Sequence, residues 1–168
     1  YVELVYKFNL KKGKEIKKEN LKEIIYKENY LKAKNKAFNI LSKCDQSEKI
    51  LKEKLSKDFD DDIVLDVLDF LKENKLINDE FLAKKIINTN VNLNKYGKNK
   101  IKQNLYKKGI ENKYINALID DIDEDKEFEN ALFIASKKYE KIKNNDKNKV
   151  YQKLYSHLIY KGFDFETT

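Results

Sequence analysis

The feature that most constrains this chain is a match between two of its own segments. Residues 100–110 (KIKQNLYKKGI) align without a gap with residues 153–163 (KLYSHLIYKGF), a shift of 53 residues. Both segments hold two apolar residues four positions apart, followed by Lys-Gly and another apolar residue. Apolar residues at i and i+4 share one helix face, and a glycine after the last turn readily adopts the left-handed conformation that ends a helix. Each segment therefore predicts an amphipathic helix that stops at Gly109 or at Gly162.

A third copy of this pattern lies upstream, at residues 51–59. Leu51 and Leu55 repeat the apolar pair, and Phe59 takes the place of the last apolar residue after a slip of one position. Asp58 stands where the other copies have glycine, so we expect a weaker helix stop here.

The helices in front of these segments also recur. Ala37, Ala83 and Ala131 each lie three positions before an apolar residue, and a small side chain on a helix face lets a neighbouring helix approach closely. Residues 45–48 (DQSE) resemble a capping box, and residues 78–80 (NDE) are suited to begin the next unit. The chain is thus predicted to repeat a unit of three helices over roughly 50 residues.

The composition agrees with this interpretation, because the chain has no proline and only four glycines. We expect an all-α fold of tandem three-helix repeats, stacked into an elongated curved body. The expected organisation is an N-terminal segment (1–30), repeat 1 (31–77), repeat 2 (78–124) and repeat 3 (125–168), in which the last helix is missing. The alternative is a compact helical bundle in which the self-similarity is coincidental.

The beginning of the chain follows a different pattern. Residues 2–10 alternate between apolar and polar side chains as in a strand, whereas residues 21–25 have helical spacing, and Gly13 lies between the two. The sequence begins with Tyr1 and contains no methionine, so we expect it to be a segment of a longer protein.

The reactive residues give no candidate for catalysis. Cys44 is the single cysteine, so there is neither a disulfide framework nor a thiolate metal cluster, and a reducing cytosolic location fits. His157 is the single histidine, and its counterpart in the self-match is Asn104. No glycine-rich phosphate loop, nucleophile motif, metal-ligand spacing or long apolar span occurs. We expect a cytoplasmic, monomeric protein that is not an enzyme, has no cofactor or metal, and has no contact with a membrane.

The charge pattern favours a binding role. The formal net charge is +7 and every basic residue is a lysine, while residues 58–69 and 120–129 form two acidic runs. Lysines in contact with phosphate give salt-sensitive attraction without sequence preference, although a basic stretch is also often a solvated helix face. Nearby tyrosines could stack on bases, but at helical spacing they more often pack in the core. The residues we expect to contact a partner protein or DNA are Lys84, Lys85, Lys95, Tyr96, Lys98, Lys100, Lys102, Lys107 and Lys108.

Several of these segments resemble the RecX family of regulatory proteins. The resemblance runs from about Leu31 to Phe163. It is most specific where a leucine-rich helix end (65–77) meets Asn-Asp-Glu-Phe and Ala83, and at residues 96–110 with their Lys-Gly-Ile stop. It implies tandem three-helix repeats and binding to the recombinase RecA, alone or as a filament on single-stranded DNA, with inhibition of its ATPase and strand-exchange activities. Members tend to carry arginines where this chain has Asn88 and Asn90, which puts in doubt a contact of these two positions with DNA or with the filament.

Two other functions remain open from the residues alone. One is a general helical nucleic-acid-binding protein, of single- or double-stranded DNA, without a dedicated recombinase partner. The other is a protein-interaction scaffold for which the net charge is incidental.

Overall fold

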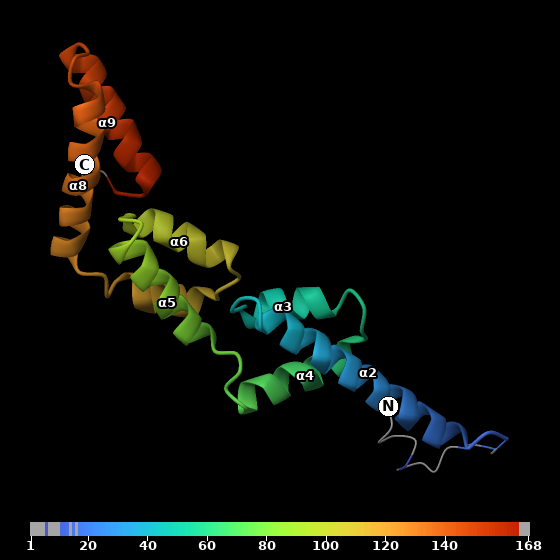
Figure 1. Ribbon diagram of the computed structural model, residues 1–168. Helices are drawn as coiled ribbons and strands as arrows, with labels where there is room; N and C mark the ends of the chain where they lie inside the picture. The colour runs from blue at the N-terminus through green and yellow to red at the C-terminus, as the bar shows by residue number, and fades with distance from the viewer. Residues whose placement is uncertain (1–5, 7–10, 14, 16, 165–168) are drawn as a thin grey trace. The chain divides into compact units, whose positions relative to one another are not determined.

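The computed structural model describes residues 6, 11–13, 15 and 17–164, and every regular element in this part of the chain is an α-helix. Three helices belong to the first repeat, three to the second and two to the third (Figure 1). The all-α fold of tandem repeats is therefore confirmed. The helices are α2 (Lys18–Leu41), α3 (Glu48–Leu55), α4 (Asp61–Glu73), α5 (Asp79–Asn92), α6 (Lys98–Lys107), α7 (Asn112–Ile119), α8 (Glu124–Ile142) and α9 (Lys147–Lys161).

The chain divides into two compact units, Tyr1–Asn78 and Asp79–Thr168. In the first unit α4 packs on both α2 and α3. Its core joins Ala33 and Ala37 of α2 to Leu51 and Leu55 of α3, and all four side chains are fully buried. The remaining core side chains are five from one face of α4 and one that follows this helix: Ile63, Val64, Val67, Leu68, Leu71 and Ile77.

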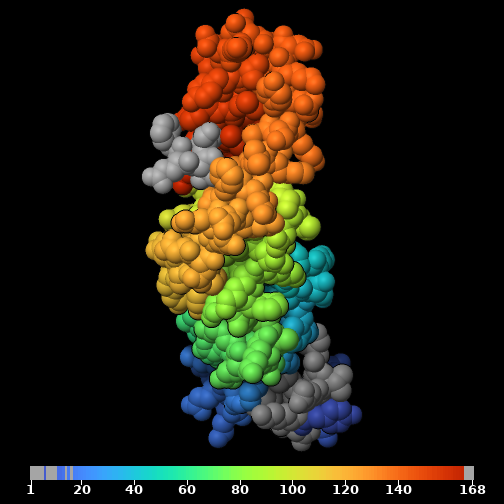
Figure 2. Space-filling model, turned by 90° about the vertical axis from the view of Figure 1, so that its left-hand side faces the viewer, coloured from blue at the N-terminus to red at the C-terminus, as the bar shows by residue number. Residues whose placement is uncertain are grey.

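The second unit contains α5 to α9. Here α5 packs against α6, α7 and α8, and α8 packs along α9. In the space-filling view the green atoms of α5 and the amber atoms of α7 form one continuous surface (Figure 2). Burial of Ala83 with Ile101 and Leu105 makes the core of the second repeat, and burial of Ala131 with Leu158 and Phe163 makes that of the third.

The three repeats share one packing contact. In each repeat the second residue of the apolar pair lies in the same buried cluster as the small residue of the preceding helix. The pairs are Leu55 with Ala37, Leu105 with Ala83, and Leu158 with Ala131. The self-match therefore marks one structural module, as predicted.

The glycine stops are confirmed as well. Gly109 has φ of +73° and Gly162 has φ of +92°. In each case the amide after the glycine donates to a carbonyl five residues back, from Ile110 to Leu105 and from Phe163 to Leu158. This is the Schellman arrangement that ends a helix with a left-handed residue.

The first repeat uses other end signals. Asp58 has no left-handed backbone, and its amide donates to the Leu55 carbonyl within the closing turn. The helix α3 begins within the predicted run 45–48, but its N-cap is Ser47: this side chain is buried and its hydroxyl accepts from the Ile50 amide at 3.3 Å. A capping box between Asp45 and Glu48 stays a prediction. The alternating pattern of residues 2–10 lies, except for Tyr6, outside the described residues.

Candidate partner-binding surface

The nine residues predicted to contact a partner lie on two helices of the second repeat and the turn between them. Lys84 and Lys85 belong to α5, Lys95 and Tyr96 to the turn, and the other lysines to α6 and its C-terminal cap. Because Ile101 and Leu105 turn one face of α6 into the core, the lysines of this helix are distributed over its remaining sides.

These side chains differ in how accessible they are. Lys84, Lys85, Lys107 and Lys108 are exposed, whereas Lys95, Lys98, Lys100 and Lys102 are partly covered. Tyr96 packs against the core of the second repeat. The predicted residues thus form an exposed group and a partly covered group, and the second group also keeps part of its surface in contact with solvent.

Lys98 is held by a buried carboxylate of the third repeat. Its backbone amide donates to Glu127 Oε1 at 2.8 Å, and its ammonium lies 3.6 Å from Glu127 Oε2. Only 7% of the Glu127 side chain is exposed, whereas the neighbouring Glu124, Asp125 and Glu129 are exposed. Lys98 therefore connects two repeats.

The first turn of α6 is also joined to the last turn of α9. The Gly97 amide donates to the Lys161 carbonyl at 3.1 Å, and the Asn99 amide donates to the Gly162 carbonyl at 3.0 Å. Together with the Lys98 amide, three amides at the N-terminus of α6 donate to acceptors in the third repeat. These amides have no acceptor within their own helix, and two of the acceptors are carbonyls at the end of α9 that accept no bond within that helix. We call this contact the helix-end joint, made by Gly97, Lys98, Asn99, Glu127 and residues 161–162.

Both glycines of the joint are required by its close backbone approach. A Cβ atom on Gly97 would lie 2.4 Å from the Gly162 carbonyl oxygen, and one on Gly162 would lie 2.2 Å from the Lys100 amide nitrogen. Gly97 has an ordinary φ of −76°, so at this position the requirement is space alone. Gly162 has both requirements, a left-handed backbone and space.

Two lysine–tyrosine contacts cross the joint in opposite directions. The Lys100 ammonium lies 5.0 Å from the centre of the Tyr160 ring, and the Lys161 ammonium lies 5.1 Å from the centre of the Tyr96 ring. Such cation–π contacts are attractive by about 0.5 to 1 kcal/mol at exposed sites. Each contact brings a lysine of one repeat next to a tyrosine of the other.

The predicted alternative for the tyrosines, packing rather than stacking on bases, holds for some of them. Tyr96 and Tyr114 pack on the core of the second repeat. Tyr151 and Tyr160 are each 69% exposed, and Tyr106 is 46% exposed. The exposed rings lie on α6 and α9, the same helices that the self-match relates.

The two asparagines that replace the expected arginines have different positions. Asn90 is buried: its amide group donates to the Ile86 carbonyl at 2.7 Å, and its oxygen accepts from Asn104 Nδ2 at 2.9 Å. Asn88 is exposed and bonds to Asn92 at 2.5 Å. Position 90 is therefore part of the internal packing of the second repeat.

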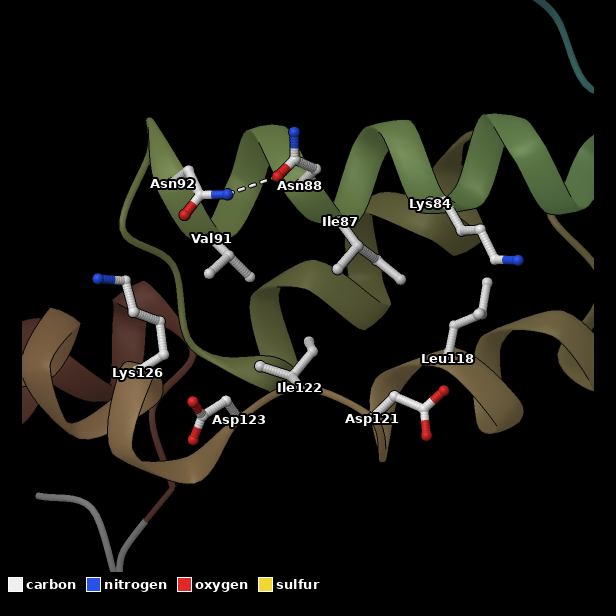
Figure 3. Close-up of a pocket in the computed structure, with 10 residues that line it drawn as sticks. All are labelled: Lys84, Ile87, Asn88, Val91, Asn92, Leu118, Asp121, Ile122, Asp123 and Lys126. Atoms are coloured by element: carbon white, nitrogen blue, oxygen red, sulfur yellow. Dashed lines mark hydrogen bonds between the residues drawn. The ribbon is translucent and has the colours of Figure 1, made fainter.

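Lys84 lies at the rim of a pocket between α5 and the end of α7 (Figure 3). Ile87 and Val91 of α5 point towards Leu118 and Ile122, which gives the pocket an apolar floor. The cavity measures about 290 Å³. Its rim carries charges of both signs: Lys84, Lys126, Asp121 and Asp123.

The predicted surface omits residues that only the folded chain brings near it. Sequence reasoning missed Glu127, Asn130 and the lysines of α9. Asn130 is buried and its amide group donates to the Val91 carbonyl at 2.9 Å, so it joins α8 to the end of α5. The sequence did contain one signal for α9, because the self-match relates this helix to α6, the helix that, with its C-terminal cap, carries most of the predicted lysines.

The single histidine should sense the positive field on this side of the molecule. Burial lowers the pKa of His157, and the charges of Lys138, Lys161 and Lys141 lower it further. The neutral imidazole is therefore favoured in the folded state, so the contribution of His157 to stability is complete above pH 6.5 and is lost as the pH decreases from 6.5 through the lowered pKa. We expect the one imidazole resonance in proton NMR to titrate below pH 6.5 and Lys138→Gln to raise its midpoint; a midpoint at or above 6.5 would contradict this field.

The described residues include neither a metal centre nor a membrane span. No group of three or more His, Cys, Asp and Glu side chains in that part of the chain is placed to hold a metal ion. None of the helices there is long and apolar enough to cross a bilayer.

The fold and its site define a helical repeat protein whose second and third repeats are joined through helix ends and present lysines and tyrosines. Three family models match consecutive segments: the first three-helix domain of RecX over residues 33–71, the second over 78–119 and the third over 124–168. The chain belongs to the RecX family.

Individual relatives agree with this assignment. The regulatory protein RecX of Clostridioides difficile (strain 630) is 61% identical over 99% of this chain and 78% of its own length. That of Clostridium perfringens (strain 13 / Type A) is 37% identical over 98% of this chain and 78% of its own length. A crystal structure of a regulatory protein RecX superimposes with a TM-score of 0.83 at 25% identity, over 99% of this chain and 84% of the other. The RecX structure from Lactobacillus salivarius gives 0.76 at 26% identity, over 83% and 92%.

Proposed function

We propose that this protein binds the RecA recombinase, as free protein or as a filament on single-stranded DNA, and inhibits its ATP hydrolysis and strand exchange. The observation that carries the proposal is the match to all three RecX domains in order along the chain. The exposed lysines of the second repeat supply the attraction, either to DNA phosphate or to acidic surface of the filament. The protein would act in the cytoplasm, where its partner works, and by occupying a surface rather than by catalysis.

The joined second and third repeats suit this mode of action. Because Gly97, Lys98 and Asn99 are bonded to the third repeat, the two repeats can engage a filament together without first ordering their contact. A contact that is already ordered costs less conformational entropy on binding. Bound in this way, the protein would bridge subunits and hinder the motions that ATP turnover requires.

A RecA ATPase assay on single-stranded DNA tests the proposal. We expect ATP hydrolysis to fall as the protein is titrated in. The triple variant Lys102→Gln/Lys107→Gln/Lys108→Gln should need about tenfold more protein for the same effect and should respond less to added salt, because about three attractions to phosphate or carboxylate groups are removed. Lys98 is left unchanged because it also holds the helix-end joint.

The control removes the same charge from the corresponding helix of the first repeat. Lys49, Lys52 and Lys57 are exposed and lie on or just after α3. Their replacement by glutamine should leave inhibition near that of the unaltered protein. Absence of inhibition by the unaltered protein would refute the proposed function, and equal loss in both triple variants would remove the second repeat from it.

A further inference from the structure

The helix-end joint brings together two helices that carry lysines and no acidic residue. Within α6 (Lys98–Lys107) and within α9 (Lys147–Lys161) there is neither Asp nor Glu. All other described helices contain acidic residues, apart from α7. The joint therefore brings the start of α6 to the end of α9, two helices with several lysines that no acidic residue of the same helix offsets.

Two of the four lysines of α9 share one side of that helix with a tyrosine. Lys149 and Lys153 are four residues apart, and Tyr160 follows seven residues later, which is the spacing of a single helix face. Lys149, Lys153 and Tyr160 are all exposed. On α6, Lys100 and Lys107 are likewise seven residues apart and share a face.

The contact between Lys100 and Tyr160 makes these two faces continuous. The Lys100 ammonium lies over the Tyr160 ring, 5.0 Å from its centre, so the two faces meet at this contact. We call it the lysine–tyrosine strip, formed by Lys149, Lys153, Tyr160, Lys100 and Lys107.

The charge of the strip is not neutralised within the described part of the protein. None of its four lysines forms an ion pair with a carboxylate there, and Lys153 bonds only to the neutral amide oxygen of Asn145, at 3.3 Å. By contrast, Lys84, Lys113 and Lys126 elsewhere in the second unit each pair with a glutamate.

We propose that the lysine–tyrosine strip binds single-stranded polynucleotide directly, with its lysines on the phosphates and Tyr160 stacked on a base. This inference rests on the proposed function and deepens it, because it adds a contact of this chain with the nucleic acid of the filament. An exposed aromatic ring between lysines fits a base between phosphates, since every base offers a π-face to such a ring. An acidic protein surface would satisfy the lysines but would leave the exposed ring without a matching group.

Binding of a fluorescent oligothymidylate, measured by anisotropy without any recombinase, tests the inference. A length of about 20 nucleotides exceeds the usual footprint of about 4 to 16 nucleotides for such sites. Lys149→Gln/Lys153→Gln should weaken binding about tenfold at low salt. The same variant should reduce the slope of log K against log salt by about 1.4, which is about 0.7 for each phosphate that is no longer neutralised. Tyr160→Leu should also weaken binding about tenfold but should leave that slope unchanged, because stacking releases no counterions.

A control variant has the same loss of charge on α3, Lys49→Gln/Lys52→Gln, and should bind as the unaltered protein does. Circular dichroism and thermal unfolding of each variant show whether its fold is retained.

If the unaltered protein does not bind the oligonucleotide, or if the α9 variants bind it normally, the inference is refuted, whatever the ATPase assay gives. If the α9 variants lose binding to DNA-free recombinase while they still bind the oligonucleotide, the strip is a protein-binding surface instead. Oligonucleotide binding without inhibition would refute the proposed function alone.

Discussion

Replacement of Gly97 by alanine is expected to destabilise the second unit by about 3 kcal/mol, although the change from glycine to alanine at the start of a helix is normally mild. The new Cβ would lie 2.4 Å from the Gly162 carbonyl oxygen and 2.5 Å from the Phe163 amide nitrogen. These are backbone atoms and cannot rotate away as a side chain would. Relief of the overlap requires the ends of α6 and α9 to separate, which breaks the bonds from Gly97 and Asn99 to the last turn of α9.

Urea unfolding followed by circular dichroism measures this effect. The matched control is Glu111→Ala, which places alanine at the same position of the next helix, just before α7. Glu111 has a similar φ of −68°, is exposed, and its side chain makes no cap bond to the helix. We expect the control to change the free energy of unfolding by less than about 0.5 kcal/mol. An unchanged midpoint for Gly97→Ala would mean that the two helix ends are not in contact in solution.

Loss of the Glu127 carboxylate is expected to have the second largest effect. Glu127→Ala leaves the Lys98 amide without its acceptor in a place where water has little access, and this should cost about 2 to 3 kcal/mol. Glu127→Gln keeps an oxygen that can accept the same bond, so it should cost about 1 kcal/mol. The difference between the two variants separates the hydrogen bond from the ionic attraction.

The neighbouring Glu129 provides the control, because it is exposed and pairs with Lys126 on the same helix, at 2.8 Å. Glu129→Ala should cost less than about 0.5 kcal/mol, as is usual for surface pairs. In a double-mutant cycle, Lys98→Met should cost less in the Glu127→Ala background than alone, since the ammonium then has no partner to lose. Additive effects of the two changes would exclude a direct interaction between these side chains.

The parts of the fold that were predictable from the sequence are those with a local cause. A helix that ends with a left-handed residue favours glycine, because glycine adopts this backbone conformation at low cost. Gly109 and Gly162 can therefore be recognised in the sequence itself. Close helix packing requires a small side chain, so Ala37, Ala83 and Ala131 stand out too. The elongated, curved arrangement of the repeats stays a prediction, as do the repeat boundaries.

The joint between the second and third repeats had no such local signal. Glu127 lies in a run of acidic residues, and nothing in the sequence distinguishes it from its exposed neighbours. Gly97 follows a tyrosine in a turn, where glycine has many uses. Both are determined by contacts between residues about 30 to 65 positions apart, and only the folded chain brings these together. For the same reason Lys98 was assigned to partner binding alone, although it also holds the third repeat.

The occupied start of α6 has a consequence for how this protein can recognise phosphate. Free amides in the first turn of a helix are a common anion site, and they favour one phosphate in one fixed position. In α6 the carbonyls of Lys161 and Gly162 and the carboxylate of Glu127 already fill that position. In the proposed complex, recognition of phosphate would thereby be left to long, mobile ammonium groups, which would tolerate many backbone geometries of a nucleic acid and would let the protein shift along a strand without dissociating from it.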